Sequence, residues 1–111
     1  MNLTVNQLDD QIVITVDETR LDAAIATRFK DRMREIVTKV CIPVLIDMRR
    51  VDFMDSSGLG AMIAVHKAMP HGIGLTLDGL TPNVDRVFRL TRMDSVFAIR
   101  NSPPQKQEKR A

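Results

Sequence analysis

The stretch that decides the fold of this chain is residues 54–60, MDSSGLG. It follows a short apolar run at residues 44–48 and precedes a segment, residues 59–66, in which apolar side chains recur at helical spacing. The first pattern predicts a strand and the second a helix. Aspartate and serine are favoured at helix N-caps, because their side-chain oxygens accept free backbone N–H groups. We therefore expect Ser56 at or next to the cap, either as an ordinary capping signal or as a functional hydroxyl.

Upstream of this junction, the pattern predicts a hairpin and then a long helix. Residues 2–16 hold two stretches rich in β-branched side chains, joined by an acidic turn, which is typical of an antiparallel pair. From Leu21 to Val40, apolar residues keep spacings of three and four, with charged residues between them. This pattern predicts an amphipathic helix with Asp22 near its start, where a carboxylate suits the helix dipole. Pro43 ends anything helical before the apolar run, which we expect to be an interior strand.

Downstream, the motif helix is expected to run to about Ala68, because proline and glycine follow it. Residues 73–77 predict the last strand, and Pro82 is placed to open a further helix. The segment 102–111 begins with two prolines among polar and charged residues, which predicts a disordered polar tail.

A strand pair followed by alternating helices and strands predicts an α/β fold. We expect one domain over residues 1–101, with a mixed sheet of four or five strands and helices packed on it. Phe97 and Ile99 are expected to cover this sheet.

Composition narrows the class of protein. A chain of 111 residues suits one domain. No apolar run approaches a membrane span, and no basic-then-apolar leader opens the chain, so a soluble cytoplasmic protein is expected. The single cysteine, Cys41, cannot form an internal disulfide, and its apolar neighbours predict a buried side chain. A net charge of +2 without Trp or Tyr argues against nucleic-acid binding.

Residues for catalysis are not arranged as an enzyme would need them. Neither serine of the motif lies in a Gly-x-Ser-x-Gly elbow. His66 follows Ser56 by ten positions, about 15 Å along one helix, which is too far for a general base. The histidines and the cysteine have no metal-ligand spacing, and no phosphate-binding loop is present. We therefore expect no enzyme activity, cofactor or metal, and a protein that is acted upon.

The motif also resembles a family signature. Asp55-Ser56-Ser57-Gly58-Leu59-Gly60 is similar to the signature of the STAS-domain anti-sigma factor antagonists. Arg20-Leu21-Asp22 resembles the Gly-x-Leu-Asp turn of that family, with Thr19 where the family often has glycine, and residues 87–97 resemble its C-terminal helix and exit. The resemblance covers roughly residues 1–100 and implies a STAS-like α/β sandwich.

The resemblance also implies a function and partners. In this family the unphosphorylated protein binds an anti-sigma factor that is itself a serine kinase, and so releases the client, a sigma factor or another regulator. The kinase uses ATP and Mg²⁺ to phosphorylate the antagonist, and a PP2C-type phosphatase resets it. By this resemblance Ser56 is the phosphate acceptor. The other residues expected to bind the partner are Arg20, Asp22, Asp55, Ser57, Gly58, Leu59, Gly60, Ala61 and Met62.

Each of these assignments has a structural alternative. Asp22 and Asp55 could serve only the helix starts, the two glycines only the turn, and Arg20 and Met62 could be ordinary surface residues. The whole chain could also be a STAS adaptor that is never phosphorylated and scaffolds a larger complex, such as a transporter. The simplest expectation for the free protein is a monomer.

Overall fold

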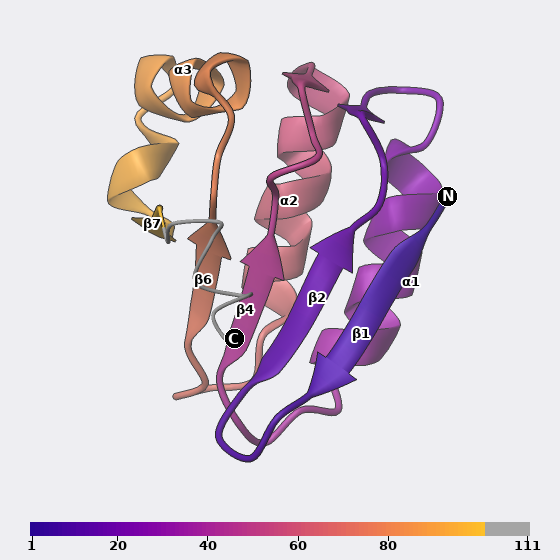
Figure 1. Cartoon of the computed structure of the whole chain (residues 1–111), viewed down its shortest axis with the longest axis vertical. Helices are drawn as coiled ribbons and strands as arrows, with labels where there is room; N and C mark the ends of the chain where they lie inside the picture. Colours follow the sequence, from indigo (N-terminus) through magenta and orange to yellow (C-terminus); the bar gives the residue numbers. More distant parts are fainter. Residues whose placement is uncertain (102–111) are drawn as a thin grey trace, which may run out of the picture.

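The computed structural model describes residues 1–101 and contains one mixed five-stranded sheet. The predicted tail, residues 102–111, lies outside the described part. The strand order is β1-β2-β4-β6-β7, with β1 antiparallel to β2 and every later neighbour parallel (Figure 1). This arrangement confirms the α/β class, the N-terminal hairpin and the interior place of β4. The strands are β1 (Leu3–Gln7), β2 (Ile12–Val16), β4 (Val44–Asp47), β6 (Leu75–Asp78) and β7 (Ala98–Arg100).

Two helices pack side by side on one face of this sheet. They are α1 (Ala26–Val37) and α2 (Ser56–Ala68), which follow β2 and β4 in the chain and contact each other along their length (Figure 1). A third helix, α3 (Pro82–Leu90), follows β6 and begins with the proline, as predicted. A short 3₁₀ turn, η1 (Met93–Ser95), leads from α3 into β7.

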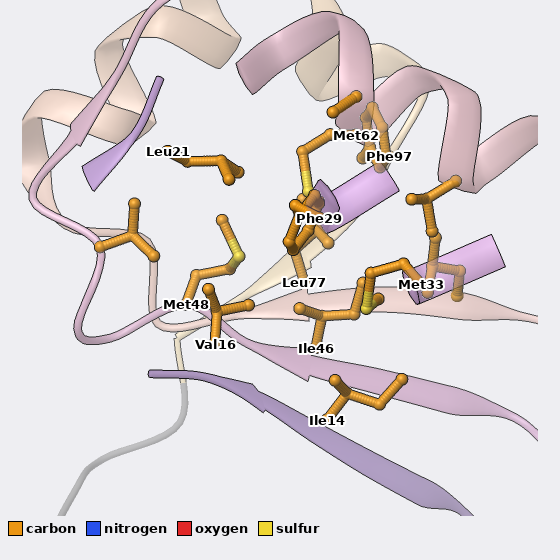
Figure 2. Close-up of a cluster of buried hydrophobic side chains, with 14 of the residues drawn as sticks. Ile14, Val16, Leu21, Phe29, Met33, Ile46, Met48, Met62, Leu77 and Phe97 are labelled. Atoms are coloured by element: carbon orange, nitrogen blue, oxygen red, sulfur yellow. The ribbon is translucent and has the colours of Figure 1, made fainter. Parts of the chain in front are cut away.

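The core lies between the sheet and the two packed helices. Alternate residues of each strand point to the same face, so Ile14, Ile46 and Leu77 from three neighbouring strands line up beneath the helices (Figure 2). Phe29 of α1 and Met62 of α2 descend onto them, and all five side chains are fully buried. Burial of one such side chain contributes about 1.5–3 kcal/mol, so this layer supplies much of the stability.

A buried ionic cluster holds the far edge of the sheet. Asp78, at the end of β6, is only 3% exposed and pairs with Arg49 at 3.4 Å and with Arg100 of β7 at 3.7 Å. The Gly79 N–H also donates to the Arg100 carbonyl at 2.9 Å. These contacts fix β7, a strand of three residues that the sequence did not indicate.

Several boundaries differ from the predictions. The first helix begins at Ala26 and not at Leu21, because Arg20 and Leu21 form β3 (Arg20–Leu21). Leu21 is fully buried there, so its apolar character extended the helical pattern falsely. Residues 73–77 do not form the last strand, since β7 follows.

Cys41 is also placed differently from the prediction. Its side chain is exposed, because it lies in the bend between α1 and β4 and not inside an element. The apolar residues on either side of it in sequence are buried or half-buried, which is why the pattern suggested an interior position.

A second, very short sheet positions the residues around the motif. β3 pairs in parallel with β5 (Phe53–Met54), and the Asp55 N–H donates to the Leu21 carbonyl at 3.4 Å. The first turn of α2 then lies directly against β3. A Cβ atom on Gly58 would come within 2.1 Å of the Leu21 carbonyl oxygen, whereas one on Gly60 would meet nothing within 4 Å. The two glycines of the motif therefore have different structural roles.

We expect Gly58→Ala to destabilise the domain by about 1–3 kcal/mol, because the added methyl group overlaps backbone that β3 and β5 hold in place. Gly60→Ala is the matched control. It is expected to stabilise the domain by about 0.5–1 kcal/mol, since alanine lowers the entropy cost of an exposed helical position. Urea unfolding of both variants would measure the two changes. Equal stability of the two variants would contradict the close contact at Gly58.

Candidate functional site

Two serine hydroxyls stand at the start of α2. Ser56 and Ser57 are its first two residues, and both side chains are exposed. Asp55 is the N-cap, and its Oδ1 accepts a hydrogen bond from the Gly58 N–H at 3.0 Å. Ser56 thus lies next to the cap, as predicted, with its hydroxyl open to a partner.

The carboxylate of Asp55 also joins two segments that are distant in sequence. Its Oδ2 accepts a hydrogen bond from the Ala23 N–H at 3.2 Å, so it ties the loop after β3 to the start of α2. The hydrogen bond from Gly58, supported by that from Ala23, holds the pKa of Asp55 below its ordinary value against a smaller opposing effect of desolvation. The group next to Ser56 is therefore a carboxylate at neutral pH.

Arg20 and Asp22 lie in and directly after β3, the segment that Asp55 ties to the start of α2. Asp22 Oδ1 accepts a hydrogen bond from the Ala24 N–H at 3.1 Å, and its Oδ2 faces the Arg20 Nε at 3.2 Å. The Arg20 guanidinium also lies over the ring of Phe53, 4.3 Å from its centroid. Asp22 is thus a loop-capping residue, and Arg20 is an exposed cation held next to the motif. The expectation that Arg20 and Asp22 bind a partner stays a prediction.

Four of the remaining residues that we expected to bind the partner are buried, namely Gly58, Leu59, Ala61 and Met62. Met62 is fully buried, and the Leu59 and Ala61 side chains are 9% and 4% exposed. The predictions that Met62 reaches a docked partner and that Leu59 and Ala61 form a contact face are wrong for this conformation, because these side chains form the core side of α2. Gly58 is buried as well, whereas Gly60 is exposed on the outer side of the helix.

A shallow groove of about 290 Å³ runs between α1 and α2, beginning beside Ser57. Its α2 side is made of small residues, including Gly60 and Ala64, and its α1 side includes Thr27 and Lys30. Sequence reasoning missed Thr27, Lys30 and also Phe53. Thr27 and Lys30 have the helical spacing of one face, but only the parallel packing of the two helices brings that face next to the motif.

The chemistry available at Ser56 is that of an accessible hydroxyl beside a carboxylate. His66 packs its ring edge-on against Phe97, with 4.9 Å between centroids, and Phe97 packs in the same way against Phe88 at 5.3 Å. His66 is therefore a packing residue near the other end of α2. Within residues 1–101, no group of His, Cys, Asp or Glu side chains could hold a metal ion. None of the helices in that range has the length and apolar character needed to cross a membrane.

Comparisons with known proteins agree with this arrangement. The anti-sigma-B factor antagonist of Listeria monocytogenes is 30% identical over 82 residues, which is 73% of this chain and 72% of that protein. The structure of an anti-sigma factor antagonist from Mycobacterium paratuberculosis superposes with a TM-score of 0.80 at 22% identity, covering 89% of this chain and 84% of the other. The Bacillus cell fate determinant SpoIIAA in its phosphorylated form superposes with a TM-score of 0.69 at 15% identity, covering 98% of each chain.

The model of the STAS domain matches residues 2–105, nearly the whole chain. The fold and the junction at residues 54–60 agree with that match, and the chain belongs to the STAS domain family.

Proposed function

We propose that this chain is an anti-sigma factor antagonist switched by phosphorylation of Ser56. In its unphosphorylated form it binds an anti-sigma factor that is a serine kinase, and the kinase then releases its client, a sigma factor or another regulator. Transfer of phosphate from ATP to Ser56 ends the binding, and a PP2C-type phosphatase restores it. All of these steps belong to the cytoplasm. The observation that carries the proposal is an exposed serine hydroxyl at a helix start, in a chain that is 30% identical over 82 residues to an anti-sigma-B factor antagonist.

The local electrostatics support a switch at this position. A phosphate adds nearly two negative charges and three acceptor oxygens. The helix tolerates this group, because its dipole and free N–H groups favour an anion at the N-terminus. A docked partner does not tolerate it in the same way, since the new charge lies next to the ionised Asp55 and must lose its hydration at the interface.

Exposed residues surround Ser56 at the start of α2. Ser57 and Gly60 are exposed beside it on α2, and Arg20 extends from β3. Small residues on α2 allow the backbone of a partner to approach closely, whereas Leu59, Ala61 and Met62 act indirectly by fixing α2 to the sheet. A role in binding therefore fits the site better than catalysis, because the neighbouring Asp55 carboxylate already accepts hydrogen bonds from the Gly58 and Ala23 N–H groups, which make it a weaker base.

Phosphorylation of Ser56 is tested by intact mass. Incubation with ATP, Mg²⁺ and the serine kinase encoded beside its gene is expected to add one phosphate to the native chain. We expect Ser56→Ala to abolish this gain and Ser57→Ala to retain it, because only the neighbouring hydroxyl is lost in the second variant. A phosphate that persists in Ser56→Ala would remove Ser56 as the acceptor. No phosphate on the native chain with any cognate kinase would favour the STAS adaptor.

Added charge at the same position is expected to weaken kinase binding. For Ser56→Asp we expect an affinity loss on the order of a hundredfold, equivalent to a few kcal/mol. Asn6→Asp adds the same charge on the exposed edge strand β1 and is expected to leave the affinity unchanged. Isothermal titration calorimetry would measure both. Equal losses in the two variants would mean that the net charge of the chain, and not its position, controls binding.

A further inference from the structure

A second surface feature lies at the other end of the molecule. An open groove of about 370 Å³ separates the edge strand β1 from the C-terminal end of α1. Its lining is mainly apolar and includes Val5, Ile12, Ile36, Val40 and Ile42.

The groove exists because β1 extends beyond the helix layer. Val5 is paired with Ile14, whose side chain points into the core, so Val5 faces the helix side of the sheet as well. Ile14 is fully buried, whereas Val5 is 43% exposed. Leu8, which follows β1 in the hairpin turn, is 48% exposed. Of the five large apolar side chains that are exposed in the described part of the chain, Val5 therefore lines this groove and Leu8 lies three residues further along, in the hairpin turn.

The two walls of the groove carry opposite charges. On the β1 side, the hairpin turn places the exposed Asp9 and Asp10 directly after Leu8. On the α1 side, the exposed Lys39 lines the groove. None of these three residues forms an ion pair with another residue of the described range 1–101.

We propose that this groove is the interface of a homodimer. A two-fold axis through the groove places the β1 wall of each copy against the α1 wall of the other, as in isologous interfaces generally. Leu8 and Val5 of one copy then cover the apolar lining of the other copy. The acidic turn of each copy faces Lys39 of the other, so the charge pairing occurs twice. The occupant is a second copy of this chain, because one surface supplies both the exposed apolar side chains and the oppositely charged residues that would face them.

The hairpin turn cannot fill its own groove. The Leu8 N–H donates to the Gln11 carbonyl at 2.8 Å, and the Ile12 N–H donates to the Pro43 carbonyl at 2.9 Å. These hydrogen bonds hold the turn as an extension of the β1 wall. The unpaired acids and Leu8 therefore remain available to another molecule.

This dimer leaves the Ser56 site free. The hairpin turn precedes the parallel strand β2, whereas α2 begins after β5, at the opposite end of the sheet (Figure 1). The dimer therefore presents two copies of the motif, and the inference does not depend on the proposed function. The groove is small, so we expect a weak dimer with a dissociation constant on the order of 10–100 μM.

Sedimentation equilibrium over a concentration series tests the inference. The native chain is expected to rise from its monomer mass of 12.5 kDa toward twice that value. Lys39→Glu alone and the double variant Asp9→Lys/Asp10→Lys alone are each expected to raise the dissociation constant roughly tenfold or more, because like charges then face each other twice. Lys67→Glu, on the exposed side of α2, is the matched control and is expected to dimerise like the native chain.

An equimolar mixture of the two charge variants gives the decisive result. In a mixed dimer the acidic turn of the Lys39→Glu copy faces Lys39 of the other copy, and the lysine turn of the other copy faces the glutamate at position 39. We therefore expect the mixture to regain dimer that neither variant forms alone. Regain of dimer also shows that both variants are folded. Three results would each overturn the inference. The native chain could stay monomeric up to about 1 mM, the charge variants could dimerise like the native chain, or their mixture could form no more dimer than either variant alone.

Discussion

The first turn of α2 lies against the backbone of β3, and the rest of the site depends on this contact. It is possible because residue 58 has no side chain and the Leu21 carbonyl occupies the space where a Cβ would stand. The contact sets the height of Ser56 above the sheet and the distance between the motif and the loop that carries Asp22. A buried residue thus determines how the exposed hydroxyl is presented.

Asp55 adds the electrostatic part of the same constraint. One of its carboxylate oxygens serves the helix start and the other serves the loop after β3. The hydrogen bonds that perform this structural task also lower its pKa, so a negative charge stays beside Ser56 under neutral conditions. The group that assembles the site is therefore also the group that places a negative charge beside the Ser56 hydroxyl.

The sequence was most informative where local chemistry decides the structure. Three such signals are the proline at residue 82, the capping residue before α2 and the acidic turn of the N-terminal hairpin. Each acts within a few positions, and the corresponding elements are confirmed. The predictions failed where a distant segment decides. Leu21 fits a helical period but pairs with Met54 across the chain, and Met62 lies two residues after the DSSGLG motif but points into the core. A motif shows that a stretch has a role, but only packing shows which of its side chains reach the surface.

The two ends of the sheet provide independent surfaces, and the reason is the direction of the chain. Parallel strands place their carboxyl ends, and hence the starts of the following helices, at the same end of the sheet. Helix starts with free N–H groups favour anions, so the end that carries Ser56 is the one suited to phosphate chemistry. The opposite end holds the hairpin turn and the end of α1, where an apolar groove and complementary charges remain. The layer of buried side chains lies between these two surfaces, so neither surface shares residues with the other.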